Sequence, residues 1–118
     1  MPLYMTEFSY TPEAWARLAR NPQDRAAAFG ELVERAGGRL VSFYYSYGEH
    51  DGVAIFDVPD ESIAYGVTIA AETPGHLKAI RTIRLFTPEE TMQVLRTAGA
   101  LPYQAPVPRP PLGAVGPG

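Results

Sequence analysis

The sequence predicts an α+β fold of the ferredoxin-like βαββαβ type, with an antiparallel four-stranded sheet and an added C-terminal helix. Stretches rich in Val, Phe and Tyr alternate with stretches whose apolar residues recur every three or four positions. Glycines and prolines mark the borders between these stretches. Their order is strand, interrupted helix, strand, strand, helix, strand and helix, which is the order that this fold requires.

The first strand and the helical region after it have clear local signals. Residues 3–10 alternate in polarity and carry three aromatic side chains, which is typical of a strand. Thr11 then supplies an N-cap, and Pro12 suits the first helical position, where no backbone N–H is needed. Pro22 interrupts this helix because proline cannot donate to the helical ladder. We expect a second helix to begin there, with Asn21 as its N-cap.

The second helix is expected to end at Gly37-Gly38, because glycine adopts the left-handed C-terminal conformation easily. Two strands follow, over residues 39–47 and 51–58, and the turn Gly48-Glu-His-Asp-Gly52 joins them. On the first of these strands we expect two sets of side chains to point to opposite faces, one of Val41, Phe43, Tyr45 and Tyr47 and the other of Leu40 and Tyr44.

The second half of the chain predicts a helix, a strand and a last helix. Residues 51–58 are apolar on both faces, which favours a central strand. A helix then runs from about Asp60 to the Thr73-Pro74-Gly75 break, and a strand covers residues 76–86. Thr87-Pro-Glu-Glu90 is a capping box for a final helix that reaches about residue 98.

Right-handed crossovers place the first and third strands in the centre of the sheet and the fourth beside the first. The helices then cover only one face of the sheet. The other face carries large side chains as well, so we expect a second copy of the chain to cover it, as a homodimer or a higher homo-oligomer.

Composition narrows the functional classes. The chain has 118 residues, no cysteine and a net charge of −3, with ten basic residues spread along it. A nucleic-acid partner is therefore not expected. No long apolar stretch or signal-like N-terminus predicts a membrane partner, and we expect a cytoplasmic protein.

The Pro- and Gly-rich C-terminus differs from the rest of the chain. Six of twelve prolines and four of eleven glycines lie in residues 99–118, without a period of 2 or 3.6. We predict a single domain over residues 1–98 and an extended or disordered tail over residues 99–118.

Several of these motifs, in this order, resemble the GYD domain family of small bacterial proteins. The matching stretches are 10–13, 37–38, 43–51, 58–60 and 82–87, and the similarity covers about residues 3–93. The resemblance implies a fold of the dimeric α+β barrel type and leaves the biochemical role open. Gly48 and Asp51 match the turn for which the family is named, whereas His50 stands where the family has a tyrosine.

The turn offers two candidate catalytic residues, His50 and Asp51. A histidine can act as an acid or a base near neutral pH, and a carboxylate can orient it. The alternative is structural: Asp51 accepts backbone N–H bonds, and the two glycines supply unusual dihedral angles.

Arg81 is a third candidate, because it stands in an apolar row of the last strand. An unpaired charge in such a row is costly, so it needs a carboxylate or an anionic ligand. Glu7 stands on the neighbouring first strand, and we predict that the two side chains lie close together. The pair is either a structural ion pair or part of a pocket floor. The other row of the last strand, His76 to Arg84, is expected to face solvent or a partner.

Aromatic side chains are numerous for this length and suit both pockets and interfaces. The predicted ligand-binding set is Trp15, Tyr45, Tyr47, Tyr65, Glu7 and Arg81. Trp15 is expected either to anchor the core or to wall a cleft. The histidines have no metal-ligand spacing and no nucleotide-binding loop is present, so we predict neither a metal site nor a cofactor.

Three functions remain open at this point. The first is a homo-oligomeric protein that binds a small aromatic or apolar molecule in a pocket between helices and sheet. The second is an enzyme of the cofactor-free oxygenase or isomerase type, by analogy of fold. The third is a non-catalytic assembly or regulatory protein. We favour the first, with catalysis as an open question.

Overall fold

The computed structural model describes residues 1–107 of the chain. It is an α+β fold, as the sequence predicts. The elements in chain order are β1 (Leu3–Tyr10), α1 (Pro12–Arg20), α2 (Arg25–Arg35), β2 (Arg39–Tyr45), β3 (Gly52–Asp57), α3 (Glu61–Glu72), β4 (Leu77–Leu85) and α4 (Pro88–Gly99). Within residues 1–107, every helix falls short of the length and apolar character that a membrane span needs.

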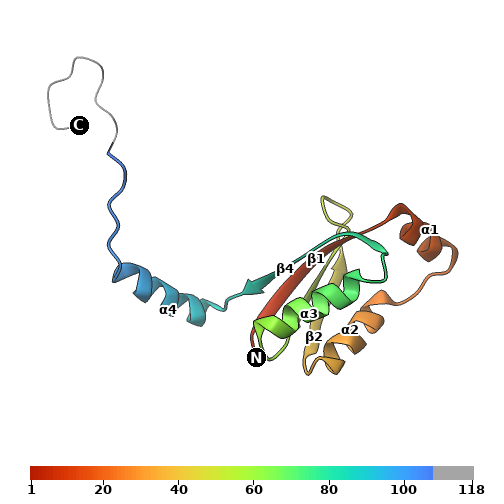
Figure 1. The fold of residues 1–118 in the computed structure, drawn as a ribbon, viewed down its shortest axis with the longest axis horizontal. Helices are drawn as coiled ribbons and strands as arrows, with labels where there is room; N and C mark the ends of the chain where they lie inside the picture. The colour runs from red at the N-terminus through yellow and green to blue at the C-terminus, as the bar shows by residue number, and fades with distance from the viewer. Residues whose placement is uncertain (108–118) are drawn as a thin grey trace, which may run out of the picture. The chain divides into compact units, whose positions relative to one another are not determined.

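The four strands form one antiparallel sheet in the order β2-β3-β1-β4. The predicted strand order is therefore confirmed, with β1 and β3 in the centre. Figure 1 shows α2 and α3 on the same side of this sheet, with α1 beyond its end. α2 packs over β2, and α3 packs over β4.

The sheet has one helix-covered face and one open face, and the register assigns the side chains to them. The core cluster under α2 and α3 contains Tyr4, Val33, Phe56, Val58, Ala64 and Val67. A second cluster near α1 contains Phe8, Tyr10 and Ala14. On the open face, Ile55, Met5 and Ile83 lie opposite one another across β3, β1 and β4. Odd-numbered residues of β1 thus face away from the helices, and even-numbered residues face toward them.

The prediction for β2 is wrong in its alternation. A bulge between Leu40 and Ser42 adds one residue to β2. Leu40 therefore shares the helix-covered face with Phe43, and both pack against the core clusters. Val41 is exposed, and Tyr44 is 67% exposed. Strict alternation cannot anticipate the extra residue, so it assigned Leu40 to the wrong set.

Six element ends also differ from the sequence prediction. β2 ends at Tyr45, two residues before the predicted end, and β3 and β4 are each shorter by a residue at both ends. Asn21 is the C-cap of α1, and the N-cap of α2 is Asp24, whose side chain accepts from the Ala27 N–H at 3.0 Å. Asp24 is placed three residues before that amide, which is the spacing an N-cap needs.

The other helix ends agree with their predicted signals. Thr11 caps α1, Asp60 caps α3, and Thr87 forms a capping box with Glu90 at α4. Gly37 follows α2 with a φ of +87°, a conformation that a side chain disfavours.

The chain divides into two compact units, Met1–Phe86 and Thr87–Gly118. The second unit contains α4, on which no residue is buried. The predicted tail over 99–118 is described up to residue 107, where it has no regular structure after the helix, and residues 108–118 lie outside the described part.

Candidate functional site

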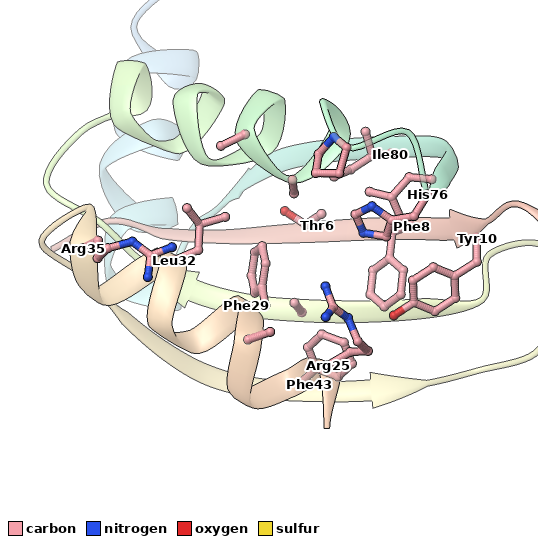
Figure 2. A pocket seen from close by; sticks show the side chains of 16 residues that line it. Thr6, Phe8, Tyr10, Arg25, Phe29, Leu32, Arg35, Phe43, His76 and Ile80 are labelled. Atoms are coloured by element: carbon pink, nitrogen blue, oxygen red, sulfur yellow. The ribbon is translucent and has the colours of Figure 1, made fainter. Parts of the chain in front are cut away.

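A pocket of about 210 Å³ lies in the first unit, between α2, α3 and the helix-covered face of the sheet. Its residues come from six elements and the loop before β4 (Figure 2). They are Thr6, Phe8, Tyr10, Arg25, Ala28, Phe29, Leu32, Arg35, Phe43, Ala54, Ala70, Ala71, Pro74, His76, Leu77 and Ile80. The lining is mainly aromatic and aliphatic with a few polar groups, which is the usual character of a small-molecule site.

The pocket takes its shape from residues that alternate along β1. Thr6, Phe8 and Tyr10 all point to the helix-covered face and are buried. The Phe8 ring lies against Gly52 of β3, where a Cβ atom would collide with it. Glycine at position 52 therefore gives the ring its place at the side of the pocket.

Positive charge lies on the helix side of the pocket. Arg25 and Arg35 extend from α2 in Figure 2. No carboxylate within residues 1–107 comes within 4.0 Å of Arg25, whose guanidinium contacts the Gln23 side chain at 3.4 Å. An anionic group on a bound molecule would meet an unneutralised cation there.

The pocket lining contains two titratable side chains that are influenced by Arg25, those of His76 and Tyr10. Desolvation, and then the charge of Arg25, lower the pKa of His76 below its ordinary value. Desolvation, and then the neighbouring Tyr45 hydroxyl, raise the pKa of Tyr10. His76 is therefore neutral at pH 7 and able to accept a proton, while Tyr10 keeps its proton. Tyr10, Arg25 and His76 also line a second hollow of about 180 Å³ beside α1.

None of the residues predicted from the sequence as ligand-binding lines the main pocket. Trp15 on α1 instead forms an aromatic group with Tyr45 and Tyr47, in which only the two tyrosine rings are stacked. The Tyr45 and Tyr47 rings are 6.2 Å apart and 8° from parallel, and Trp15 lies 6.2 Å from Tyr45. Tyr65 is exposed on α3.

Asp51 fastens the turn to the first strand and helix. Its Oδ2 accepts from the Tyr10 backbone N–H at 2.9 Å and from Trp15 Nε1–H at 3.0 Å. Its own N–H donates to the Phe8 carbonyl at 2.9 Å. These contacts match the structural alternative for Asp51, because the carboxylate holds the hairpin, β1 and α1 together.

The open face carries the other predicted site residues. Arg81 Nη2 lies 2.8 Å from Glu7 Oε1, so the predicted proximity of these side chains is confirmed. His50 Nε2 lies 3.3 Å from Glu7 Oε2 on the other side of the carboxylate. Glu7 therefore joins His50 and Arg81 in one cluster, and Asp51 lies outside it. The cluster stands on the face opposite the pocket.

The row of β4 that was expected to face solvent or a partner instead faces the helices in its central part. Ile80 lines the pocket, as does His76 just before the strand, and Thr82 is buried. The register explains this, since Ile80 pairs with Phe8 and Thr82 with Thr6. This pairing of β4 with the even-numbered residues of β1 is the signal that would have shown which row of β4 faces the helices.

No group of three or more side chains suited to a metal ion occurs within residues 1–107. The polar groups of the pocket are two arginines, a histidine, a tyrosine and a threonine.

Comparison with known proteins addresses the fold and the family. The crystal structure of MtbAldR (Rv2779c) superimposes with a TM-score of 0.52 at 12% identity, over 73% of this chain and 52% of that one. This likeness supports the fold alone, and the chain spans about half the length of that protein. No curated protein matches the chain. The model of the GYD domain matches residues 4–95, which contain β2, β3, β4 and all of β1 except Leu3, so the chain belongs to the GYD domain family.

Proposed function

We propose that this protein binds a small, mainly apolar molecule, about the size of one substituted ring, in the pocket between α2, α3 and the sheet. The observation that carries the proposal is the pocket itself. Its volume of about 210 Å³ exceeds the ~150 Å³ of an engineered apolar cavity that accepts benzene. Phe8, Phe29 and Phe43 supply aromatic walls.

The charge of the pocket refines the ligand class. Arg25 has no carboxylate partner within residues 1–107 and lines the pocket. An anionic substituent on the ring would be stabilised beside it. Benzoate is therefore expected to bind more tightly than benzyl alcohol, and Arg25→Gln to remove that preference.

A pocket-filling variant tests the proposal directly. Ala28 lines the pocket from α2, whereas Ala27 on the same helix is exposed and does not. Ala28→Phe is expected to abolish binding of toluene and phenol, measured by ligand-observed NMR, and Ala27→Phe to leave it intact. Binding that survives Ala28→Phe would place the ligand elsewhere and overturn the proposal. Native mass spectrometry of freshly purified protein would detect a co-purifying ligand in the same experiment series.

A second copy of the chain is the proposed partner, through the open face of the sheet. Support comes from Ile55, Met5 and Ile83, which lie side by side there, and from the exposed Tyr44 on the same face. Sheets with two apolar faces need cover on both. Ile83→Asp is expected to shift sedimentation toward a single subunit. Ile69→Asp, at an exposed position on α3, is its control.

One observation favours catalysis of the cofactor-free type as a second candidate. His76 lines the pocket and its lowered pKa keeps it neutral, so it can take a proton from a bound molecule. Mass spectrometry of a ligand incubated with the protein would reveal turnover. If the ligand binds but is not converted, catalysis is ruled out for that ligand and binding remains the proposed function.

A further inference from the structure

Three threonine hydroxyls form a chain that ends at the pocket. Thr6 Oγ1 on β1 lies 2.7 Å from Thr82 Oγ1 on β4, and Thr82 Oγ1 lies 2.5 Å from Thr68 Oγ1 on α3. Thr68 donates to the Ala64 carbonyl at 3.0 Å. Thr6 is only 2% exposed, yet it lines the pocket, on its sheet side in Figure 2.

The Ala64 carbonyl fixes the direction of the hydrogen bonds between the three threonine hydroxyls. A hydroxyl has one proton to donate, and a carbonyl oxygen can only accept. Thr68 gives its proton to Ala64, so the contact between Thr68 and Thr82 requires the proton of Thr82. The contact between Thr82 and Thr6 then requires the proton of Thr6. All three protons are therefore used within this row of hydroxyls and by the Ala64 carbonyl.

Thr6 Oγ1 is left as an acceptor on the pocket wall. Its neighbours in the sheet are Ala54 and Thr82, and the proton of Thr82 is already used. Apart from Thr82, no hydrogen-bond donor among residues 1–107 reaches Thr6 Oγ1. A buried oxygen with unused acceptor capacity favours a donor that arrives with the ligand.

We propose that Thr6 is a specificity-determining residue that selects apolar ring molecules carrying an O–H or N–H donor, of which a phenol is the simplest. This inference rests on the proposed function, because it assigns the ligand class of the same pocket. The apolar walls hold the ring, and the donor meets Thr6 Oγ1. A neutral ligand whose polar group only accepts would place its lone pairs against those of Thr6 Oγ1 and bind more weakly, whereas an anionic group is stabilised at Arg25 instead.

Phenol and toluene are the matched probes, since a hydroxyl replaces a methyl group of similar size. Their different hydration cancels when the ratio of their dissociation constants is compared between variants. We expect Thr6→Val to reduce the preference for phenol over toluene by about tenfold relative to the natural protein. Thr6→Ser keeps the hydroxyl and is expected to keep the preference, which separates the loss of the oxygen from damage to the fold.

Thr82→Val tests the direction of the hydrogen bonds between the threonine hydroxyls. It removes the acceptor that takes the proton of Thr6, but Thr82 itself does not line the pocket. The phenol preference is therefore expected to persist within about threefold. Benzaldehyde, which only accepts, is expected to bind several-fold more tightly in Thr82→Val, because the Thr6 proton becomes available to it.

The outcomes distinguish this inference from the function on which it rests. If neither phenol nor toluene binds the natural protein, the proposed function falls, and this inference falls with it. If both bind and Thr6→Val leaves their ratio unchanged, the donor selection is wrong while the binding function stands. If Thr82→Val does not improve benzaldehyde binding, Thr6 was never restricted to accepting, and the proposal is overturned.

Discussion

The two faces of the sheet use the same strands for different purposes. On the helix-covered face, β1 presents Thr6 and Phe8, which are buried and line a pocket. On the open face it presents Met5 and Glu7, which are only partly buried. A period of two along a single strand therefore separates the residues that line the pocket from those on the open face.

The difference shows where charge is tolerated in this fold. Glu7 and Arg81 meet on the open face, where Arg81 is 65% exposed and water still reaches the pair. The sheet side of the pocket has hydroxyls instead, and its cations extend from α2. A charge in an apolar row of the sequence thus marked the open face, whereas the neutral threonines beneath the helices gave no comparable signal.

The largest expected effect on stability distinguishes the two faces of the sheet through two neighbouring residues of β3. Phe56 is fully buried beneath the helices, and Ile55 points to the open face. Phe56→Ala is expected to lower the free energy of unfolding by about 3–5 kcal/mol, because it leaves a cavity in the core. Ile55→Ala is expected to cost about 1 kcal/mol in a dilute single subunit. Denaturant titration measures both.

Protein concentration sharpens this result. If a second copy covers the open face, the cost of Ile55→Ala grows with protein concentration, because association stabilises the folded chain. The cost of Phe56→Ala is independent of that cover. Equal costs for the two variants in a demonstrated single subunit would contradict the assignment of Ile55 to an open face.

The sequence predicts the strand order because its signals are local and consistent. Pro12, Gly37 and the capping box at Thr87 each mark an element end by a backbone requirement that the structure confirms. The bulge in β2 has no such mark, since Val41 suits a regular strand as well as a bulge. One extra residue was enough to reverse the face assigned to Leu40.

The candidate site was harder to predict than the fold. The ion pair of Glu7 and Arg81 follows from strand order and charge balance, so it could be found in advance. The pocket depends on the distance of α2 and α3 from the sheet. No local sequence pattern around Phe29 or Arg25 specifies that distance. Asp51 illustrates the same limit, because its partner Trp15 lies 36 residues away.

The second prediction concerns the fastening role of Asp51. Asp51→Ala removes the acceptor for the buried Tyr10 N–H and for Trp15, so it is expected to cost about 2 kcal/mol of stability. Asp51→Asn keeps an acceptor oxygen and is expected to cost about half as much. Fluorescence of Trp15, the only tryptophan, reports the local change during unfolding.

Glu49 provides the control in the same turn. It is exposed, so Glu49→Ala is expected to change stability by less than ~0.5 kcal/mol. A similar loss in Glu49→Ala and Asp51→Ala would mean that the turn responds to any change of charge. The assigned hydrogen bonds of Asp51 would then explain nothing.

The third prediction is a pH dependence from the helix-covered face. Burial, and then Arg25, lower the pKa of His76 in the folded chain below 6.5. The unfolded chain therefore takes up a proton first as the pH falls through 6.5, and stability decreases on acidification until the folded pKa is passed. Thermal unfolding between pH 7.5 and 5 should show this decrease, and His76→Gln should reduce it. An unchanged slope in His76→Gln would assign the effect to other groups.

The smallest expected effect is the coupling energy between Glu7 and Arg81, which measures directly whether the open face is exposed to water. A double-mutant cycle with Glu7→Gln and Arg81→Gln is expected to give a coupling energy of about 0.2–1 kcal/mol in a single subunit, because water screens an exposed ion pair. Under a second copy the same pair would be buried. Removing one partner would then leave a buried charge and cost about 3–5 kcal/mol. The coupling should therefore rise with protein concentration together with the cost of Ile55→Ala. If association is detected while the coupling stays small, the two copies meet elsewhere, and the cluster of Glu7, His50 and Arg81 remains in water.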